Sequence, residues 1–266
     1  MDRHASDIAI LGGGLAGALI ALELAASRPE LSVLLVEGQS SFGGNHIWSF
    51  FQSDISPQDS ALVDPLVVSR WTGYDVHFQG HSRRLRTPYR SITSERLNRH
   101  LHEVLPEPSL LTGTPVVSAS QRTFTLADGQ TYRTGGVIDA RGIHSLPHMQ
   151  GGWQKFAGQV LTLEQPHGLD CPIVMDARVE QVDGYRFVYC LPFSPNEVFV
   201  EDTYYSDTPD LDLPKLRARI AEYATTQDWT IASVSREETG VLPVIAAGDF
   251  QAFWETPGNR LPRLPE

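Results

Sequence analysis

Three glycines near the start of the chain have the types and spacing of a phosphate-binding turn. Gly12, Gly14 and Gly17 form a G-x-G-x-x-G pattern between the apolar run 7–11 and a helical pattern that continues to residue 26. Gly12 would allow a tight turn, Gly14 would let the backbone approach a pyrophosphate, and Gly17 would let the helix pack against the strand. Strand, turn and helix in this order predict a nucleotide-binding unit.

An acidic residue follows where dinucleotide binding requires one. Residues 32–36 predict a second buried strand, and Glu37 at its end is placed to hydrogen-bond a ribose hydroxyl. The alternative, a glycine turn that binds nothing, is disfavoured because strand, helix and terminal acid occur together. Gly43 and Gly44 favour FAD over NAD, because glycines there let the chain wrap around the adenosine and pyrophosphate side.

Two further segments are expected to approach this cofactor. Thr93 is typical of a helix start, and Arg96 in the first turn either faces the pyrophosphate or is a solvated surface arginine. Residues 136–140 predict a buried strand that contains Asp139 and leads into the glycine turn at Gly142. We therefore add Arg96 and Asp139 to the predicted cofactor site.

A pair of adjacent acids lies in an apolar strand pattern. Residues 197–205 predict a strand that forms a hairpin with residues 185–191. The period of two places Glu201 and Asp202 on opposite faces, so at most one of them points at a given substrate. A desolvated carboxyl group keeps its proton near neutral pH and can act as an acid. The alternative for Glu201 is a wet sheet face or an ion pair with Arg186 across the hairpin.

Composition excludes several functions. The 266 residues include 41% hydrophobic residues, which is enough for a globular core, and the net charge of −11 disfavours a nucleic-acid partner. The most apolar stretch, residues 8–22, is shorter than the roughly 20 residues that cross a bilayer. Cys171 and Cys190 have the spacing of neither a disulfide framework nor a zinc site, so we expect a reducing cytoplasm. No metal is assigned to His46, His144 and His167, which lack ligand spacing.

The motifs follow one another in an order that resembles the bacterial lycopene β-cyclases. The resemblance covers residues 7–249. The features that carry it are Glu37 and residues 12–17, 42–49, 89–96, 137–142, 165–169, 172–177, 184–189, 201–203 and 236–240.

The resemblance implies an α/β fold like that of the aromatic hydroxylases. A Rossmann-like FAD-binding domain would comprise residues 1–50 and 93–145, and an inserted, mainly antiparallel β-sheet substrate domain would comprise residues 51–92 and 146–249. Residues 250–266 are expected to form an irregular tail. Because family members continue into a further strand, a flavin-side loop and C-terminal helices, the resemblance also implies that the C-terminal part is missing.

The reaction that the resemblance implies is an isomerisation. The linear ends of lycopene would close to β-ionone rings, giving γ-carotene and then β-carotene without net redox change. Reduced FAD would be needed but not consumed, with NAD(P)H as its reductant. Glu201 would be the acid, and Asp202 would tune the pKa of Glu201 or hold an arginine. A cytoplasmic protein that draws this carotenoid from the membrane is expected to contact the membrane peripherally, and its oligomeric state stays open.

Ring closure also needs stabilisation of a carbocation, and aromatic faces attract positive charge. The candidates are Trp48, Phe50, Tyr185, Phe187 and Tyr189, of which the last three equally fit an ordinary sheet core. Glu237 and Glu238 could supply the final base or a tuning charge, or could form a solvated charge run.

Two other functions stay open. One is an FAD-dependent monooxygenase or oxidoreductase acting on a small aromatic or isoprenoid substrate, which would consume NAD(P)H in proportion to product. The other is an inactive, truncated FAD-binding remnant, which would be colourless and prone to aggregate.

Overall fold

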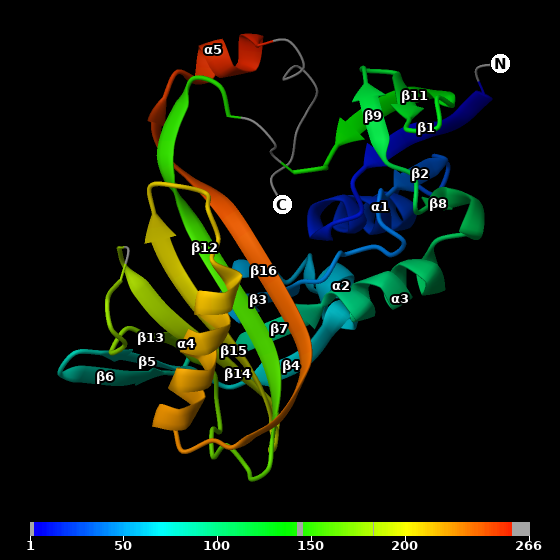
Figure 1. The fold of residues 1–266 in the computed structure, drawn as a ribbon. Helices are drawn as coiled ribbons and strands as arrows, with labels where there is room; N and C mark the ends of the chain where they lie inside the picture. The colour runs from blue at the N-terminus through cyan, green and yellow to red at the C-terminus, as the bar shows by residue number, and fades with distance from the viewer. Residues whose placement is uncertain (1–2, 143–145, 183, 257–266) are drawn as a thin grey trace.

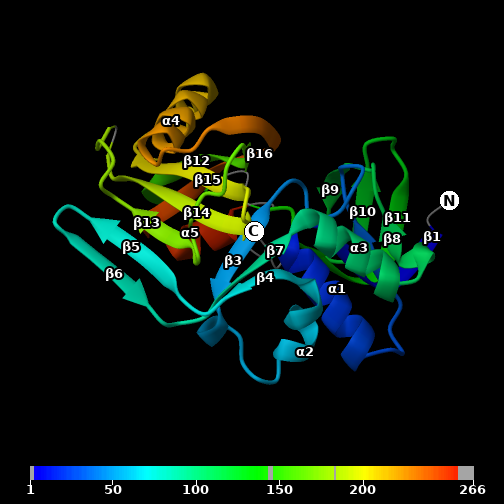
Figure 2. The same ribbon diagram turned by 90° about the horizontal axis from the view of Figure 1, so that it is seen from below.

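The computed structural model describes residues 3–142, 146–182 and 184–256, and these residues form two halves joined by a small sheet (Figure 1). Figure 2 shows the small sheet, with strands β3, β7 and β4, between the larger sheet of each half. His144 and residues 257–266 lie outside the described residues.

The N-terminal half is built on a six-stranded sheet with the order β8-β2-β1-β11-β10-β9. Strand β1 is parallel to both β2 and β11, and all four residues of β2 are buried, as expected for a parallel strand covered on both faces. Helices α1 and α3 pack on one face, where Ile10 and Leu35 meet Ala18 and Leu97. The elements of this half are β1 (Arg3–Leu11), α1 (Leu15–Ser27), β2 (Val33–Val36), α3 (Ser94–Val104), η3 (Glu107–Ser109), β8 (Leu110–Leu111), β9 (Val116–Ala119), β10 (Thr123–Leu126) and β11 (Thr131–Asp139).

The second half is built on a seven-stranded sheet with the order β16-β12-β15-β14-β13-β5-β6. Its pairs are antiparallel except that β13 is parallel to β5. Helix α4 covers one face, where Leu216 and Ile220 pack against Val188, Val198 and Val200. The elements are β5 (Tyr74–Phe78), β6 (His81–Leu85), β12 (Met149–Leu163), β13 (Ile173–Asp176), β14 (Arg186–Ser194), β15 (Glu197–Ser206), α4 (Leu213–Thr226), β16 (Ile231–Gly248) and α5 (Phe250–Glu255).

The small sheet covers the other face of the seven-stranded sheet. Tyr89, Ile47 and Phe51 pack against Leu191 and Phe199, so this part of the second face is buried. The small sheet therefore places one of its faces directly over β15. Its strands and the short elements around them are β3 (Ile47–Phe51), η1 (Gln52–Asp54), α2 (Ser60–Val63), η2 (Asp64–Leu66), β4 (Val67–Trp71) and β7 (Tyr89–Thr93).

The structure confirms the predicted secondary structure around the motifs and corrects one segment. The hairpin of β14 and β15, the α1 helix after the glycines and the helix start at Thr93 all form, and the Thr93 side chain accepts a hydrogen bond from Arg96 N (3.3 Å). The prediction of an irregular segment from residue 250 is wrong for residues 250–255, which form helix α5. Asp249 caps this helix by accepting a hydrogen bond from Ala252 N (2.9 Å).

The proposed domain boundaries stay a prediction. Residues 51–92 divide between two sheets, because β5 and β6 join the seven-stranded sheet whereas β4 and β7 pair with each other.

Cys171 and Cys190 are both buried free thiols. Within the described part of the chain, no helix is long and apolar enough to span a membrane.

Candidate active site

The glycine turn lies where β1 ends and α1 begins. Gly12 has φ +108°, and a Cβ on it would lie 2.4 Å from the carbonyl oxygen of Ala140, so only glycine fits. A Cβ on Gly17 would lie 2.0 Å from the carbonyl oxygen of Gly12. A Cβ on Gly14, by contrast, would meet nothing within 4 Å. Gly14 therefore faces open space at a helix N-terminus, where free amides attract an anionic group.

Glu37 is held beside this turn by two backbone amides. Its carboxylate accepts hydrogen bonds from Gly13 N (2.7 Å) and Gln39 N (2.8 Å). Gly43 N donates to the carbonyl oxygen of Gly13 (2.8 Å), which brings Gly43 and Gly44 to the same turn. The structure thus brings together all six of the glycine and glutamate positions that the sequence assigned to the cofactor.

A pocket of about 600 Å³ lies between residues 41–44 and α3. Its lining is drawn from the loop before β3 and from α3 over nearly its whole length, and it contains none of the acidic residues of the seven-stranded sheet. The lining residues are Ser41, Phe42, Gly44, Ser94, Glu95, Asn98, Arg99, His102 and Glu103.

The other two predicted cofactor residues have protein partners. Arg96 donates to the carbonyl oxygen of Pro65 (Nε, 2.8 Å) and pairs with Glu103 (3.2 Å). Asp139 is buried next to the turn and accepts two hydrogen bonds from the Arg141 side chain (2.8 and 2.7 Å), which raise the pKa of Arg141, and one from Arg141 N (3.3 Å). Both groups are engaged in the structure, so their roles as cofactor ligands stay predictions.

Glu201 lies on the face of the seven-stranded sheet that the small sheet covers. It is directly opposite Gly158 on β12 and Tyr189 on β14. Burial raises the pKa of Glu201 to about 7, Asp202 raises it further, and the hydrogen bond that Thr203 donates to the carboxylate opposes both. A carboxyl group in this state is protonated in a large fraction of molecules at neutral pH, which suits a general acid.

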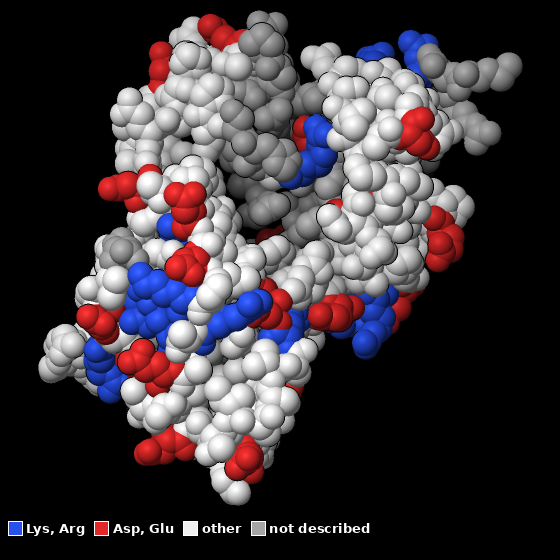
Figure 3. Space-filling view, in the orientation of Figure 1, with Lys and Arg blue, Asp and Glu red and all other residues white. Residues whose placement is uncertain are grey.

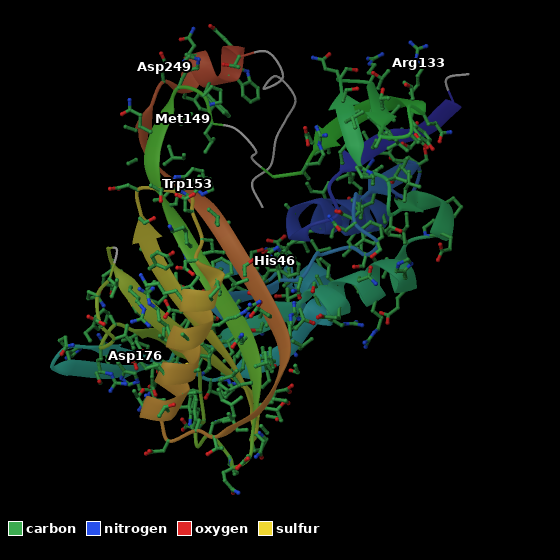
Figure 4. The ribbon with its side chains drawn as sticks, in the orientation of Figure 1. His46, Arg133, Met149, Trp153, Asp176 and Asp249 are labelled. Carbon is green, nitrogen blue, oxygen red and sulfur yellow. The ribbon has the colours of Figure 1, made fainter. Side chains whose placement is uncertain are left out.

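Asp202 points to the opposite face, as the period of two predicts. It is fully buried under α4, and both of its carboxylate oxygens accept hydrogen bonds from Arg186 Nε (3.0 and 2.9 Å). Arg219 of α4 lies 4.0 Å away. Asp202 therefore holds an arginine, and the alternative that Arg186 pairs with Glu201 is wrong. Figure 4 shows another buried acid, Asp176, near α4, where Tyr223 donates a hydrogen bond to it (3.0 Å).

Glu238 on β16 is on the same face as Glu201. Glu238 is also directly opposite Gly158, is 4% exposed, and accepts a hydrogen bond from Ile47 N (2.8 Å). Burial raises the pKa of Glu238 to about 8, with a further contribution from the charge of Glu201, whereas Arg236 lowers it. The sequence identified Glu238 only as one of two adjacent acids. Its position beside Glu201 depends on the register of β16 and β15 with β12, which the sequence pattern does not reveal.

Glu237, its neighbour, fits the interpretation of a charged surface residue. It pairs with Arg217 (2.6 and 2.7 Å) and accepts a hydrogen bond from Gln159 (2.7 Å), and the Arg217 pairing lowers the pKa of Glu237. Its backbone carbonyl accepts a hydrogen bond from the Asn45 side chain. Figure 4 shows His46, the residue between Asn45 and β3, beside β16. The loop that follows Gly44 is therefore hydrogen-bonded to β16, the strand that carries Glu237 and Glu238.

Hydroxyl groups from β14 and from the small sheet lie near Glu201. The Tyr89 and Tyr189 hydroxyl oxygens are 2.9 Å apart, and those of Ser49 and Ser91 are 2.6 Å apart. Burial raises the pKa of Tyr89 to about 12, so its phenol stays neutral. The alternation of β3 packs Trp48 and Phe50 against the N-terminal core, whereas Ile47 and Phe51 face the seven-stranded sheet, so a role of Trp48 and Phe50 in cation stabilisation stays a prediction.

Aromatic side chains continue this face away from the β14–β15 turn. Thr203 is opposite both Phe156 and Phe187, and the Tyr185 ring is 6.1 Å from Phe187 and 6.5 Å from Tyr205. Tyr185 is 43% exposed, so the sheet-core alternative is wrong for it. Figure 3 shows the surface hollowed between the two halves of the molecule. We call Phe156, Tyr185, Phe187 and Tyr205 the aromatic face.

A glycine turn of this type joined to an antiparallel sheet defines the fold of FAD-dependent oxidoreductases. One solved structure with this fold is a geranylgeranyl bacteriochlorophyll reductase-like protein from Thermoplasma acidophilum, with a TM-score of 0.63 and 12% identity over 90% of this chain and 66% of that chain. Another is the flavin-dependent monooxygenase PieE in complex with FAD and substrate, with a TM-score of 0.63 and 17% identity over 99% of this chain and 53% of that chain. Both confirm the predicted fold class.

The family model for lycopene cyclase protein matches residues 7–258, and the chain belongs to that family. It is 45% identical over 253 residues to the lycopene beta-cyclase of Pseudescherichia vulneris, which covers 95% of this chain. It is 40% identical over 249 residues to that of Pantoea ananas, which covers 94% of this chain. The chain spans 65% of the length of each of these two relatives.

Proposed function

We propose that this chain catalyses the β-cyclisation of lycopene, closing each linear end to a β-ionone ring by way of γ-carotene. The single observation that carries the proposal is the placement of Glu201. Its carboxyl group lies at the inner end of the aromatic face, under the small sheet, and burial raises its pKa to about 7. An acid with this pKa suits protonation of an alkene that carries no polar group.

The proposed chemistry transfers one proton in and one proton out at each end. The Glu201 carboxyl group gives its proton to the terminal double bond, and the resulting tertiary cation is attacked by the next reacting double bond, which forms the ring bond. Loss of a ring proton to a base restores a double bond, so the product is an isomer of the substrate. Partly buried aromatic rings next to Glu201 would hold the polyene and stabilise positive charge.

The glycine turn fits the pyrophosphate of FAD. Gly14 leaves open space at the α1 N-terminus, and the carboxylate of Glu37 stands beside it. Gly12, Gly14, Gly17, Glu37, Gly43 and Gly44 would hold the cofactor. When bound, reduced FAD supplies an electron-rich ring system that stabilises nearby positive charge. NAD(P)H as the reductant is part of the proposal.

We further propose that the protein works in the cytoplasm in peripheral contact with the membrane that dissolves its substrate. The partly exposed aromatic face supports this, because it offers an apolar surface to a hydrocarbon chain.

The test is expression of the chain in a bacterial host that accumulates lycopene, followed by extraction and separation of the pigments. Wild type is expected to convert lycopene to γ-carotene and β-carotene, and Glu201→Gln is expected to leave lycopene unchanged. Glu197→Gln is the matched control, because it removes a carboxyl group from the same strand at the hairpin turn.

Purified protein then separates the proposal from the open alternatives. With reduced FAD, a cyclase forms product without consuming NAD(P)H in proportion, whereas a monooxygenase consumes one equivalent per turnover. Unchanged lycopene in the presence of soluble wild-type protein, or equal conversion by Glu201→Gln, would contradict the proposal.

A further inference from the structure

Two carboxyl groups flank a glycine in the middle of the seven-stranded sheet. Gly158 on β12 is directly opposite Glu201 on one side and Glu238 on the other. Directly opposite residues of antiparallel strands point to the same face, so both carboxyl groups share a face. With strands about 4.8 Å apart, the two backbones are only about 9.6 Å apart.

The position between the two carboxyl groups is apolar. Gly158 contributes no side chain, and the Phe199 ring fills the vacant position, with its Cζ 2.3 Å from where a Cβ on Gly158 would lie. Phe199 itself is 1% exposed. An aromatic ring at this position screens charge weakly, and the charge of Glu201 accordingly raises the pKa of Glu238.

Glu238 has an incomplete set of counter-charges. Its carboxylate accepts a hydrogen bond from Ile47 N (2.8 Å), and the guanidinium of Arg236 lies 3.8 Å away. Arg236 makes closer contacts with Glu95 (2.8 Å) and with the Ser94 hydroxyl (3.1 Å). One guanidinium thus serves two carboxylates, and it is the nearer to Glu95.

The other titratable groups around the pair come from several elements. They are Glu95 on α3, His46 before β3, Tyr89 on β7 and Tyr189 on β14. Both phenols have raised pKa values because of burial, and both therefore stay neutral beside the carboxyl groups. The balance of charge in this region is acidic, which favours retention of a proton.

We propose that Glu238 is a positioning residue for the acid Glu201, and that the two carboxyl groups form a coupled pair that carries one proton between them near neutral pH. The proposal rests on the cyclase function proposed above. Ionisation of one member of the pair keeps the proton on the other, so a protonated carboxyl group stays available at pH values where an isolated glutamate would be ionised. Burial, which raises the pKa of Glu201 to about 7 and that of Glu238 to about 8, acts in the same direction.

The test compares Glu238→Gln with Glu237→Gln. The first removes the charge that faces Glu201 and keeps the size and one acceptor for Ile47 N, whereas the second removes a charge that faces Arg217 on the other side of the sheet. The first readout is the initial cyclisation rate of the full chain with reduced FAD as a function of pH. Glu238→Gln is expected to move the alkaline limb to lower pH by about one unit, and Glu237→Gln is expected to leave it in place.

The second readout needs no substrate. Infrared spectra of protein labelled with isotopic glutamate follow the carbonyl stretch of protonated carboxyl groups as the pH is raised. The Glu201 band is expected to disappear at lower pH in Glu238→Gln, and the Glu238 band at lower pH in Glu201→Gln, because the coupling is mutual. Glu238→Asp keeps the charge and is expected to restore most of the wild-type titration, which controls for a folding defect.

Unchanged titration of each glutamate when the other is replaced would overturn the pair, even in a protein that cyclises lycopene. Coupled titration in a protein that leaves lycopene unchanged would instead support the pair and contradict the proposed function. An equal shift of the alkaline limb in Glu237→Gln would also overturn the proposal, because it would show a general effect of charge.

Discussion

Asp202 and Arg186 form a buried ion pair under α4, on the face of the sheet opposite to Glu201. Two neighbouring acids on one strand therefore have different surroundings. Asp202 has a guanidinium partner, whereas Glu201 has a hydroxyl donor, an apolar ring and a second carboxyl group across the strand. This difference separates structural from catalytic effects in mutants.

Asp202→Asn is expected to destabilise the fold by about 3–5 kcal/mol, because it leaves the buried Arg186 charge without a carboxylate. Urea denaturation followed by circular dichroism measures this loss. Glu201→Gln, by comparison, should abolish cyclisation while the protein stays folded. A stable Asp202→Asn protein without activity would show that Asp202 takes part in the chemistry.

Gly12→Ala and Gly14→Ala are expected to have different effects. Alanine at position 12 would place its Cβ against Ala140 at φ +108°, so the protein should lose on the order of 1–3 kcal/mol of stability. Alanine at position 14 meets no protein atom, so the fold should survive and only FAD retention should fall. The flavin content of purified protein and its thermal midpoint distinguish the two. Equal flavin content in wild type and Gly14→Ala would contradict the proposed phosphate site.

Thr203→Val is expected to move the alkaline limb of the rate profile to higher pH. The Thr203 hydroxyl donates to the Glu201 carboxylate and lowers its pKa, and valine removes this donor while keeping the branched shape. The shift is opposite in sign to that expected for Glu238→Gln. Initial rates measured across the pH range check both signs in one series, and a shift of Thr203→Val to lower pH would be the contrary result.

The free energy of unfolding is expected to fall as the pH rises through the pKa values of Glu201 and Glu238. In the unfolded chain, glutamates ionise near pH ~4.3, whereas in the folded protein burial raises the pKa of Glu201 to about 7 and that of Glu238 to about 8. The stability from these groups is therefore complete below the unfolded pKa and is lost as pH rises through the folded values. Glu201→Gln should be more stable than wild type at alkaline pH by on the order of 2 kcal/mol, and equally stable near the unfolded pKa. Urea midpoints at both pH values measure the difference.

The cofactor turn could be predicted from the sequence because its geometry is local. Gly12 and Gly14 are two residues apart, and the strand and helix that position them are adjacent in the chain. The opposite faces of Glu201 and Asp202 were predictable for the same reason, since alternation along one strand fixes them.

The carboxyl pair could not be predicted, because it depends on the register of three strands. Glu201, Gly158 and Glu238 align only through the pairing of β12 with β15 and β16, which no local pattern specifies. The alternation of side chains along a strand also does not show which parts of a sheet face are covered by other elements. Tyr185 and Phe187 alternate like core residues, yet the small sheet covers only part of their face.

The hydrogen bond from Ile47 N to Glu238 joins positions that are 191 residues apart in sequence. A contact of this span closes a very large loop. The chain loses the conformational entropy of that loop before the contact can stabilise the folded state. The surroundings of both carboxyl groups are therefore a late product of folding, complete only after the N-terminal half has docked on the long strands. A fragment that contains β12 to β16 would lack Ile47 N and the small sheet that buries this face, so we expect the pKa values of both acids to be raised less in it than in the whole chain.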